Sequence, residues 1–156
     1  MPVSEDEFRR ALSCFASGVN VVTTIDAAGE LHGLTVSAFC SVSLAPPLVL
    51  ICIEKTTASH FAFRESGAFV VNILNESQVG LSEHFATPFA DKFTAVDYQA
   101  GILGIPVLAN TLASLECRIK HDFDGGDHSI FVAEVEKTSI GEGRPLLYFK
   151  SEYRQI

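Results

Sequence analysis

The chain has 156 residues, of which 47% are hydrophobic and 19% charged, so it lies far from the composition of disordered proteins and fits a single domain spanning residues 1–156. Eleven Lys and Arg stand against nineteen Asp and Glu, and the resulting net charge of −8 repels phosphate backbones and anionic lipid headgroups. The composition therefore argues against nucleic acid and membrane surfaces as partners.

The first ten residues, MPVSEDEFRR, lack the basic start and apolar run of a secretion signal, and no later stretch is long enough to cross a bilayer. We therefore expect a cytoplasmic protein. Its four cysteines and five histidines are scattered, without the spacing of a zinc site or a redox dithiol. We expect reduced thiols and no metal.

The first part of the chain predicts a helix followed by strands. Ser4 and Glu7 make a capping box, in which each side chain can satisfy the other residue's backbone N–H. Three runs rich in β-branched and apolar residues follow, separated by turn residues. The elements expected here are a helix between Ser4 and Gly18 and strands at 19–25, 31–43 and 48–53.

The rest of the chain predicts short helices between further strands. Pro and Gly interrupt any period from residue 86 to residue 108, so we expect an irregular loop there. Apolar and polar residues alternate in 115–123, which places Glu116 on an outer, exposed face. The elements expected are helices at 58–65 and 77–85 and strands at 68–74, 115–123, 128–136 and 146–150.

Strands without regular βαβ alternation predict a mainly β fold with helical insertions, arranged as an antiparallel barrel. The phosphate-binding motifs GxGxxG and GxxxxGK[ST] are absent, which argues against a Rossmann or P-loop protein. There is no GxSxG motif, and nothing in the local sequence pairs a Ser, a His and an Asp. The sequence therefore disfavours a hydrolase.

Three short strings could bind a ligand. Hydroxyls on one face of 35–43 could bond the edge of a planar polar ligand, although a solvent-facing strand also carries Ser and Thr. Residues 54–59 join a strand to a helix start, where donors can bind a phosphate or simply cap the helix. The turn 125–128 ends in His128, which either contacts a ligand or is a turn residue without a functional role. The hydroxyl residues of the first string are Thr35, Ser37, Ser41 and Ser43.

Taken in order, these strings resemble the short-chain flavin reductase family. The resemblance covers nearly the whole chain and points to the family rather than to one member. It implies the FMN-binding split-barrel fold, an antiparallel split β-barrel, and the reductase component of two-component monooxygenases. The segments that carry it are FASGVNVVTT (15–24), GLTVSAFCSVSLAPPLVLICI (33–53), FVVNILNESQ (69–78), GDHSIFVAEV (126–135) and PLLYFKSEY (145–153).

The resemblance also implies where a flavin would bind. The strand at 35–43 would line the isoalloxazine ring and ribityl chain, and the turn at 52–59 would take the phosphate. His128 would be the catalytic residue, close to the docked nicotinamide nucleotide. Several relatives carry Asn where this chain has Ser37, which shortens the reach to the ring. The implied flavin-binding residues are Thr35, Ser37, Ala38, Ser41, Val42, Ser43, Cys52, Lys55, Thr56, Ser59, Phe93 and Tyr153.

The implied activity is that of an NAD(P)H:flavin oxidoreductase, which transfers a hydride from C4 of NADH or NADPH to N5 of FMN or FAD. The reduced flavin would reach a partner monooxygenase by diffusion, and the reductase would be a homodimer with each flavin near the subunit interface. Two alternatives remain open. One is a non-catalytic flavin-binding or flavin-storage barrel. The other is an oxidase of a pyridoxal-type phosphate, which would need a basic cluster richer than Lys55 alone.

Overall fold

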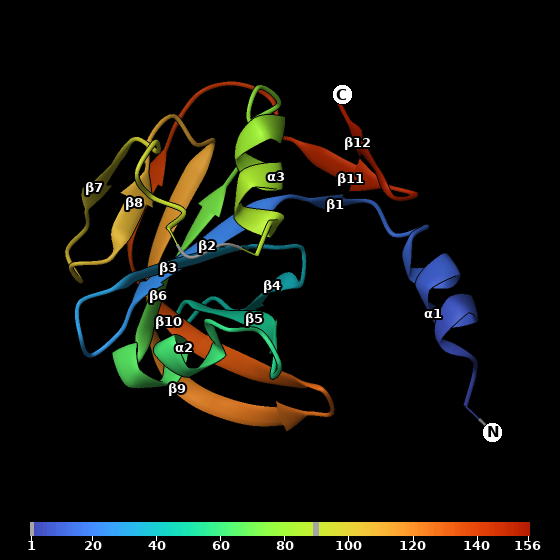
Figure 1. The fold of residues 1–156 in the computed structure, drawn as a ribbon, viewed down its shortest axis with the longest axis horizontal. Helices are drawn as coiled ribbons and strands as arrows, with labels where there is room; N and C mark the ends of the chain where they lie inside the picture. Colours follow the sequence, from blue (N-terminus) through green and yellow to red (C-terminus); the bar gives the residue numbers. More distant parts are fainter. Residues whose placement is uncertain (1, 89–90) are drawn as a thin grey trace.

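The centre of the fold is a curved sheet of seven strands, seen in a computed structural model that describes residues 2–88 and 91–156 (Figure 1). The strands are β2 (Asn20–Ile25), β3 (Leu31–Val36), β4 (Phe39–Ser43), β5 (Leu48–Glu54), β6 (Ala68–Ile73), β9 (Ala113–Gly125) and β10 (His128–Ile140). Their order is β3-β2-β6-β9-β10-β5-β4, and each pair of neighbours is antiparallel. The predicted mainly β, antiparallel fold is therefore confirmed.

The two edge strands of this sheet, β3 and β4, are neighbours in the chain. Only Ser37 and Ala38 separate them, so the sheet curls until its edges come close, which makes a partly closed barrel. The Phe39 N–H donates to the Ser37 carbonyl at 2.9 Å, which marks a tight reversal. The prediction of one strand over 31–43 is wrong, because barrel closure turns the chain at this point. Thr35 and Ser41 consequently lie on different strands.

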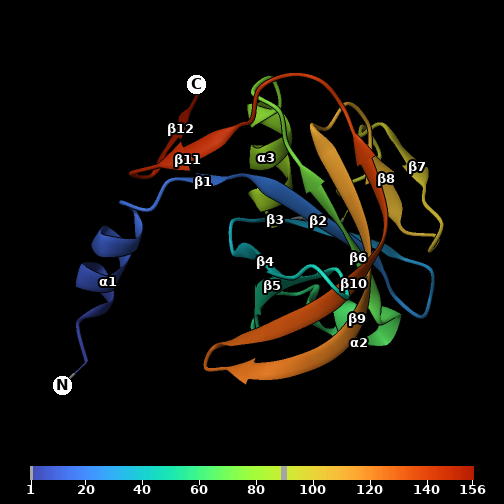
Figure 2. The same ribbon diagram turned by 180° about the vertical axis from the view of Figure 1, so that it is seen from behind.

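Within the described residues, three helices and two small sheets lie outside the barrel (Figures 1 and 2). The stretch 86–108, predicted to be irregular, contains the hairpin of β7 and β8, whose strands are too short to show a period. The helices are α1 (Glu5–Leu12), α2 (His60–Ser66) and α3 (Val79–Ala86), and the small sheets pair β1 (Ser17–Gly18), β11 (Leu147–Phe149) and β12 (Glu152–Arg154), and β7 (Tyr98–Ala100) with β8 (Pro106–Leu108).

Helix α1 begins at the predicted capping box and then lies away from the sheet. Ser4 Oγ accepts from the Glu7 N–H at 3.2 Å, and the Glu7 carboxylate accepts from the Ser4 N–H at 3.1 Å. No residue of α1 is buried, and both views show the helix to one side of the barrel (Figures 1 and 2). Its apolar side chains Phe8 and Leu12 are 57% and 51% exposed, which is unusual for an isolated subunit.

The core lies inside the curved sheet and beneath α2. Phe63 of α2 stacks on Phe131 of β10 with ring centroids 5.9 Å apart, and both rings are fully buried. Glu116 of β9 is also buried, contrary to its predicted outer position. Glu116 does lie on the face of β9 opposite to Cys117, but that face is covered rather than exposed. A Cβ atom on Gly101 would collide with the Glu116 carboxylate. Val70, the β6 residue beside Glu116, packs with Ile105. The Glu116 carboxylate accepts from the Ile102 N–H at 2.7 Å.

Among the described residues, no helix has both the length and the apolar character needed to cross a membrane.

Candidate functional site

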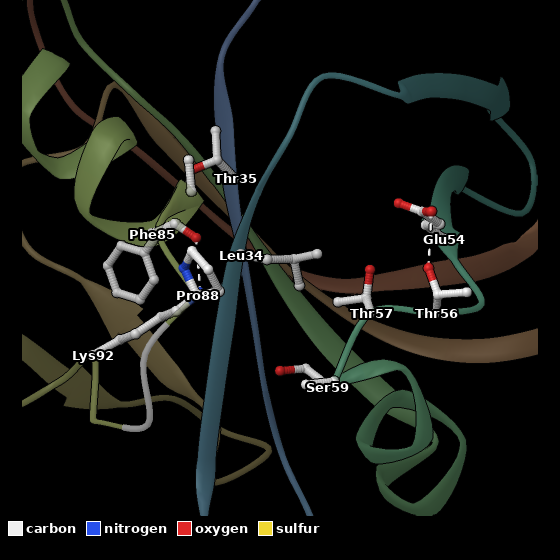
Figure 3. Close-up of a pocket in the computed structure, with 11 residues that line it drawn as sticks. Leu34, Thr35, Glu54, Thr56, Thr57, Ser59, Phe85, Pro88 and Lys92 are labelled. Carbon is white, nitrogen blue, oxygen red and sulfur yellow. Dashed lines mark hydrogen bonds between the residues drawn. The ribbon is translucent and has the colours of Figure 1, made fainter.

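A hollow of about 730 Å³ opens between three segments of the chain, and we call it the β3 cavity. Figure 3 shows β3 passing between a wall from α3 and the loop that follows it and a wall from the β5–α2 connection. This volume is within the range of small-molecule sites, about 300 to 1,000 Å³. Its lining residues are Leu34, Thr35, Glu54, Thr56, Thr57, Ala58, Ser59, Phe85, Ala86, Pro88 and Lys92.

The two walls of the β3 cavity differ in chemistry. The β5–α2 wall is rich in hydroxyls, and Thr56 Oγ1 there donates to the Glu54 carboxylate at 2.8 Å. The other wall holds the Lys92 ammonium, which donates to the carbonyls of Gly33 at 3.1 Å and Phe85 at 2.9 Å. Burial lowers the pKa of Lys92. An ammonium has three hydrogens, so it can make a third bond to a ligand here.

Behind the hydroxyl wall, three side chains form a continuous hydrogen-bonded line. Ser59 Oγ lies 3.1 Å from His32 Nδ1, and His32 Nε2 lies 2.9 Å from Asp26 Oδ2. Only Ser59 of the three lines the β3 cavity. The fold therefore brings a Ser, a His and an Asp together, although nothing in their local sequence pairs them. These residues come from three separate segments, so nothing in the local sequence could reveal the line.

Asp26 is held as the ionised end of this line. Its Oδ1 accepts from the Ala28 and Glu30 N–H groups, both at 2.9 Å, and its side chain is only 9% exposed. The hydrogen bond from His32, followed by that from the Glu30 N–H, lowers the pKa of Asp26. An ionised carboxylate only accepts, so His32 Nε2 carries the hydrogen between them.

A second hollow of about 570 Å³ lies between α1, the β4–β5 pair and the β11–β12 hairpin, and we call it the α1 hollow. The predicted site residues Ser37, Ala38 and Cys52 are here rather than in the β3 cavity. Its lining residues are Phe8, Arg9, Leu12, Ser13, Phe15, Ser17, Ser37, Ala38, Phe39, Cys40, Leu50, Cys52, Tyr148, Phe149, Lys150 and Ser151.

One face of β5 connects the two hollows. Leu50 and Cys52 line the α1 hollow, and Glu54 lines the β3 cavity. Alternate residues of a strand share a face, so these three follow one another along the same side. The residues between them, Ile51 and Ile53, are buried in the core. A long ligand could lie along this face of β5 with one end in each hollow.

Several predicted flavin-binding residues lie outside both sets of lining residues. Ser41, Val42 and Ser43 belong to the edge strand β4, where Val42 is 47% exposed. Phe93 is buried and meets Phe85 edge to face at 5.3 Å, so it supports the cavity wall from behind.

Lys55 is predicted to bind a phosphate. In the structure its side chain links the β5–α2 connection to the β9–β10 turn by hydrogen bonds. Its ammonium donates to the Asp124 carboxylate and to the Gly126 carbonyl, the latter at 2.6 Å. The hydrogen bond from Lys55 lowers the pKa of Asp124. Thr56 and Ser59, by contrast, line the β3 cavity as the phosphate prediction requires.

Tyr153 and His128 lie near the margins of the two hollows. The Tyr153 hydroxyl is 2.8 Å from Ser82 Oγ, and its ring meets Tyr148, a residue of the α1 hollow. His128 pairs across the sheet with Glu54 of the β3 cavity. Its Nδ1 lies 2.7 Å from the Asp127 carboxylate, and this hydrogen bond lowers the pKa of Asp127.

The sequence reasoning missed Lys92, Thr57, His32 and Asp26. The family resemblance pointed to Phe93, the residue that follows Lys92, and so it indicated this segment without indicating Lys92 itself. His32 and Asp26 carry no local motif. Over residues 2–88 and 91–156, no group of three or more His, Cys, Asp and Glu side chains could hold a metal ion.

Comparison with known proteins gives the class of this site and fold. Residues 12–156 match the family described as flavin reductase like domain. A relative from Rhodococcus opacus, the reductase component of 4-nitrophenol 4-monooxygenase/4-nitrocatechol 2-monooxygenase, is 43% identical over 97% of this chain and 81% of its own length. A flavin reductase (NADH) from Kitasatospora aureofaciens is 39% identical, with the same coverage of 97% and 81%.

Solved structures agree with this assignment. The NADH:FAD oxidoreductase SgcE6 of Streptomyces globisporus, solved in complex with NAD and FAD fragments, superposes with a TM-score of 0.92. It is 35% identical, and the match covers 100% of this chain and 96% of that one. The chain therefore belongs to the flavin reductase-like domain family. The split-barrel fold and the flavin reductase activity that the sequence predicts are confirmed.

Proposed function

We propose that this flavin reductase oxidises NADH or NADPH, reduces FMN or FAD bound between the two hollows, and releases the reduced flavin to a separate monooxygenase. The observation that carries the proposal is the β3 cavity, which places hydroxyls opposite a partly buried ammonium, with a second hollow farther along the same face of β5. The functions of the Rhodococcus and Streptomyces proteins support both halves of this reaction.

The residues present fit a flavin nucleotide. Its phosphate would bind at Ser59 and Lys92, because hydroxyl and ammonium hydrogens are the donors that a phosphate takes, whereas the Thr56 hydroxyl already donates to Glu54. Its apolar ring system would lie along β5 toward Ser37 and Ala38 of the α1 hollow. Lys55 is left out of this set, since it does not line the β3 cavity and its charge is paired with the Asp124 carboxylate, whereas the partners of Lys92 are neutral carbonyls.

When bound, the flavin supplies the atom that accepts the hydride, and the protein supplies orientation and electrostatics. Backbone groups at Ser37 and Ala38, at the reversal between β3 and β4, would hold the polar edge of the ring. Fixed backbone dipoles of these residues would stabilise negative charge at that edge when the flavin is reduced. The Thr35 hydroxyl donates to the Ser82 carbonyl at 2.6 Å, so toward a ligand Thr35 acts as an acceptor.

His128, which pairs with Glu54 on the neighbouring strand β5, would position the nicotinamide nucleotide beside the bound flavin. Asp127 fixes one ring nitrogen, Nδ1, which leaves Nε2 as the atom that can meet a ligand. We expect His128→Ala to raise the KM for NADH more than it changes the dissociation constant of the flavin. An equal loss on both would remove His128 from this role.

We also propose that the protein is a homodimer whose second copy covers the α1 hollow. The apolar side chains Phe8, Leu12 and Phe15 are 57%, 51% and 75% exposed around this hollow, a patch that a soluble chain rarely leaves open. Because the ring end of the flavin would lie here, the partner would complete the site.

Anaerobic mixing with NADH tests the proposed reaction. We expect the purified protein with FMN or FAD to bleach the flavin absorbance when NADH is added. A flavin-binding or flavin-storage barrel would bind the same flavin and leave it oxidised. Parallel titrations with FMN, FAD and riboflavin identify the flavin, and NADH against NADPH identifies the hydride donor.

A further inference from the structure

The hydrogen-bonded line of Asp26, His32 and Ser59 is more elaborate than an ordinary turn or helix cap requires. Asp26 and His32 are largely buried, with side chains 9% and 18% exposed, and their line ends on a hydroxyl that lines the β3 cavity. In Figure 3 the Ser59 hydroxyl points away from its own wall, toward β3. The line thus joins buried acid–base groups to a cavity whose proposed ligand carries a phosphate.

The direction of the Ser59 hydrogen bond depends on whether His32 is protonated. Asp26 accepts from Nε2, so in neutral His32 the Nδ1 atom is an acceptor and Ser59 must donate to it. Ser59 then offers only lone pairs to the cavity, which repel a phosphate. In protonated His32, Nδ1 donates to Ser59 Oγ, and the hydroxyl hydrogen is released to donate into the cavity.

The groups packed around His32 come from several elements. Asp26 faces Nε2, and the Phe61 ring of α2 covers the imidazole edge to face at 5.4 Å. Glu65 of α2 reaches the same turn, where it accepts from the Ala27 N–H at 3.0 Å. On β2, the residue opposite His32 is the uncharged Thr24. The charged groups that line the cavity itself are Glu54 and Lys92.

We propose that Asp26 and His32 are positioning residues that aim the Ser59 hydroxyl at the phosphate of a bound flavin nucleotide, so that phosphate binding draws a proton onto His32. The proton comes from solvent and stays on the imidazole. Nε2 then donates to Asp26 and Nδ1 donates to Ser59 Oγ, so that the Ser59 hydroxyl donates to the phosphate. The line would thereby favour FMN and FAD over riboflavin, which has no phosphate. This inference rests on the proposed function, because it needs the flavin phosphate in the β3 cavity.

The test compares the dissociation constants of FMN and riboflavin at about pH 6 and about pH 8, the range in which histidines exchange their protons. The proteins are the natural chain, His32→Gln, Ser59→Ala and the double variant, with His121→Gln as the matched control. His121 is exposed, stacks on Phe123 and lines neither hollow. The phosphate of FMN has its own ionisation near pH 6, but it affects every variant equally and cancels between proteins.

We expect His32→Gln to weaken FMN binding about tenfold at the lower pH, the size of one lost hydrogen bond to a charged group, and much less at the higher pH. Riboflavin affinity should stay the same in all variants, which also shows that they are folded. Ser59→Ala should match His32→Gln, and the double variant should add nothing, because His32 acts through Ser59.

Three results would overturn the inference: an unchanged FMN constant in His32→Gln at the lower pH, an equal loss of riboflavin, or additive effects in the double variant. If His32→Gln folds poorly, Ser59→Ala alone still tests the inference, because it must reproduce the selective loss of FMN. Failure of the proposed function looks different, because the natural chain would then bind neither flavin, or would bind flavin and leave it oxidised when NADH is added.

Discussion

At the scale of single residues, Lys55 and Lys92 differ in their hydrogen-bond partners and in whether they line the β3 cavity. Lys55 stands in the hydroxyl-rich string and reads from sequence as the phosphate ligand, but its ammonium is bound to Asp124 and Gly126. Lys92 has no motif, yet the fold brings its ammonium into the wall opposite Ser59. Lys92 is thus the lysine that lines the cavity, and its two partners are neutral carbonyls, whereas Lys55 is paired with a carboxylate.

This difference predicts opposite outcomes for two substitutions. Lys92→Met should weaken FMN binding about tenfold or more, because a partly buried ammonium loses a charged hydrogen bond to phosphate. Lys55→Met should leave the FMN dissociation constant nearly unchanged and cost at most about 1 kcal/mol of stability, as for other exposed ion pairs. Fluorescence titration and urea unfolding measure both quantities. The reverse pattern would restore Lys55 as the phosphate ligand.

His60 makes the free energy of unfolding depend on pH. It is 8% exposed, its Nε2 lies 2.8 Å from Ser129 Oγ, and burial, followed by the nearby Arg64, lowers its pKa below the ordinary 6.5. The unfolded chain therefore binds a proton more readily than the folded one, so stability falls as the pH drops below about 6.5. We expect the free energy of unfolding of His60→Gln, measured with urea, to fall less below about pH 6.5 than that of the natural chain. If the free energies of unfolding of the two proteins depend on pH in the same way, this role of His60 is contradicted.

At the scale of elements, the packing of α3 on β3 shapes the β3 cavity. Gly33 of β3 lies against the Phe85 ring of α3, and a Cβ atom there would come within 2.6 Å of Phe85 Cε1. The same ring lines the cavity, and the Phe85 carbonyl accepts from Lys92. A side chain at position 33 would therefore displace both the helix and the cation.

Gly33→Ala should destabilise the protein by about 1–3 kcal/mol, the usual cost of overpacking, and should weaken FMN binding as well. Gly80→Ala is the matched control, because Gly80 lies within α3 and a Cβ atom added there would meet none of the described residues within 4 Å. That change should stabilise the helix by up to about 1 kcal/mol. Urea unfolding measures both effects, and a neutral Gly33→Ala would show that the ring shifts without cost.

The elements also show what could be read from the sequence. Strands such as β2 and β5 follow from local runs of β-branched and apolar residues, and α1 follows from its capping box. The break at Ser37 and Ala38 does not, because closure of the barrel causes it and no local residue forces it. The line from Asp26 to Ser59 was equally hidden, since its members meet only after β3 packs beside α2.

At the scale of the whole molecule, the net charge of −8 gives no long-range attraction for an anionic nucleotide. Binding must come from the few local donors of the β3 cavity, which suits a reductase that releases its product. The apolar surface is placed differently. Phe8, Leu12 and Phe15 gather around the α1 hollow, at the far end of the β5 face from the β3 cavity.

The homodimer proposal predicts a change of size with substitution on this surface. Phe8→Ser combined with Leu12→Ser should shift the protein from dimer to monomer in sedimentation and weaken flavin binding, because the partner completes the ring end of the site. Ile140→Ser is the control, as Ile140 is 87% exposed and lies outside the α1 hollow. A natural chain that sediments as a monomer would contradict the proposal.

A crystal structure with FMN bound tests the central claim most directly. We predict that the phosphorus atom lies in the β3 cavity between Ser59 and Lys92, and that the ring system runs along β5 to Ser37 and Ala38. A phosphorus atom beside Lys55 at the β9–β10 turn, or a flavin outside both hollows, would contradict the account.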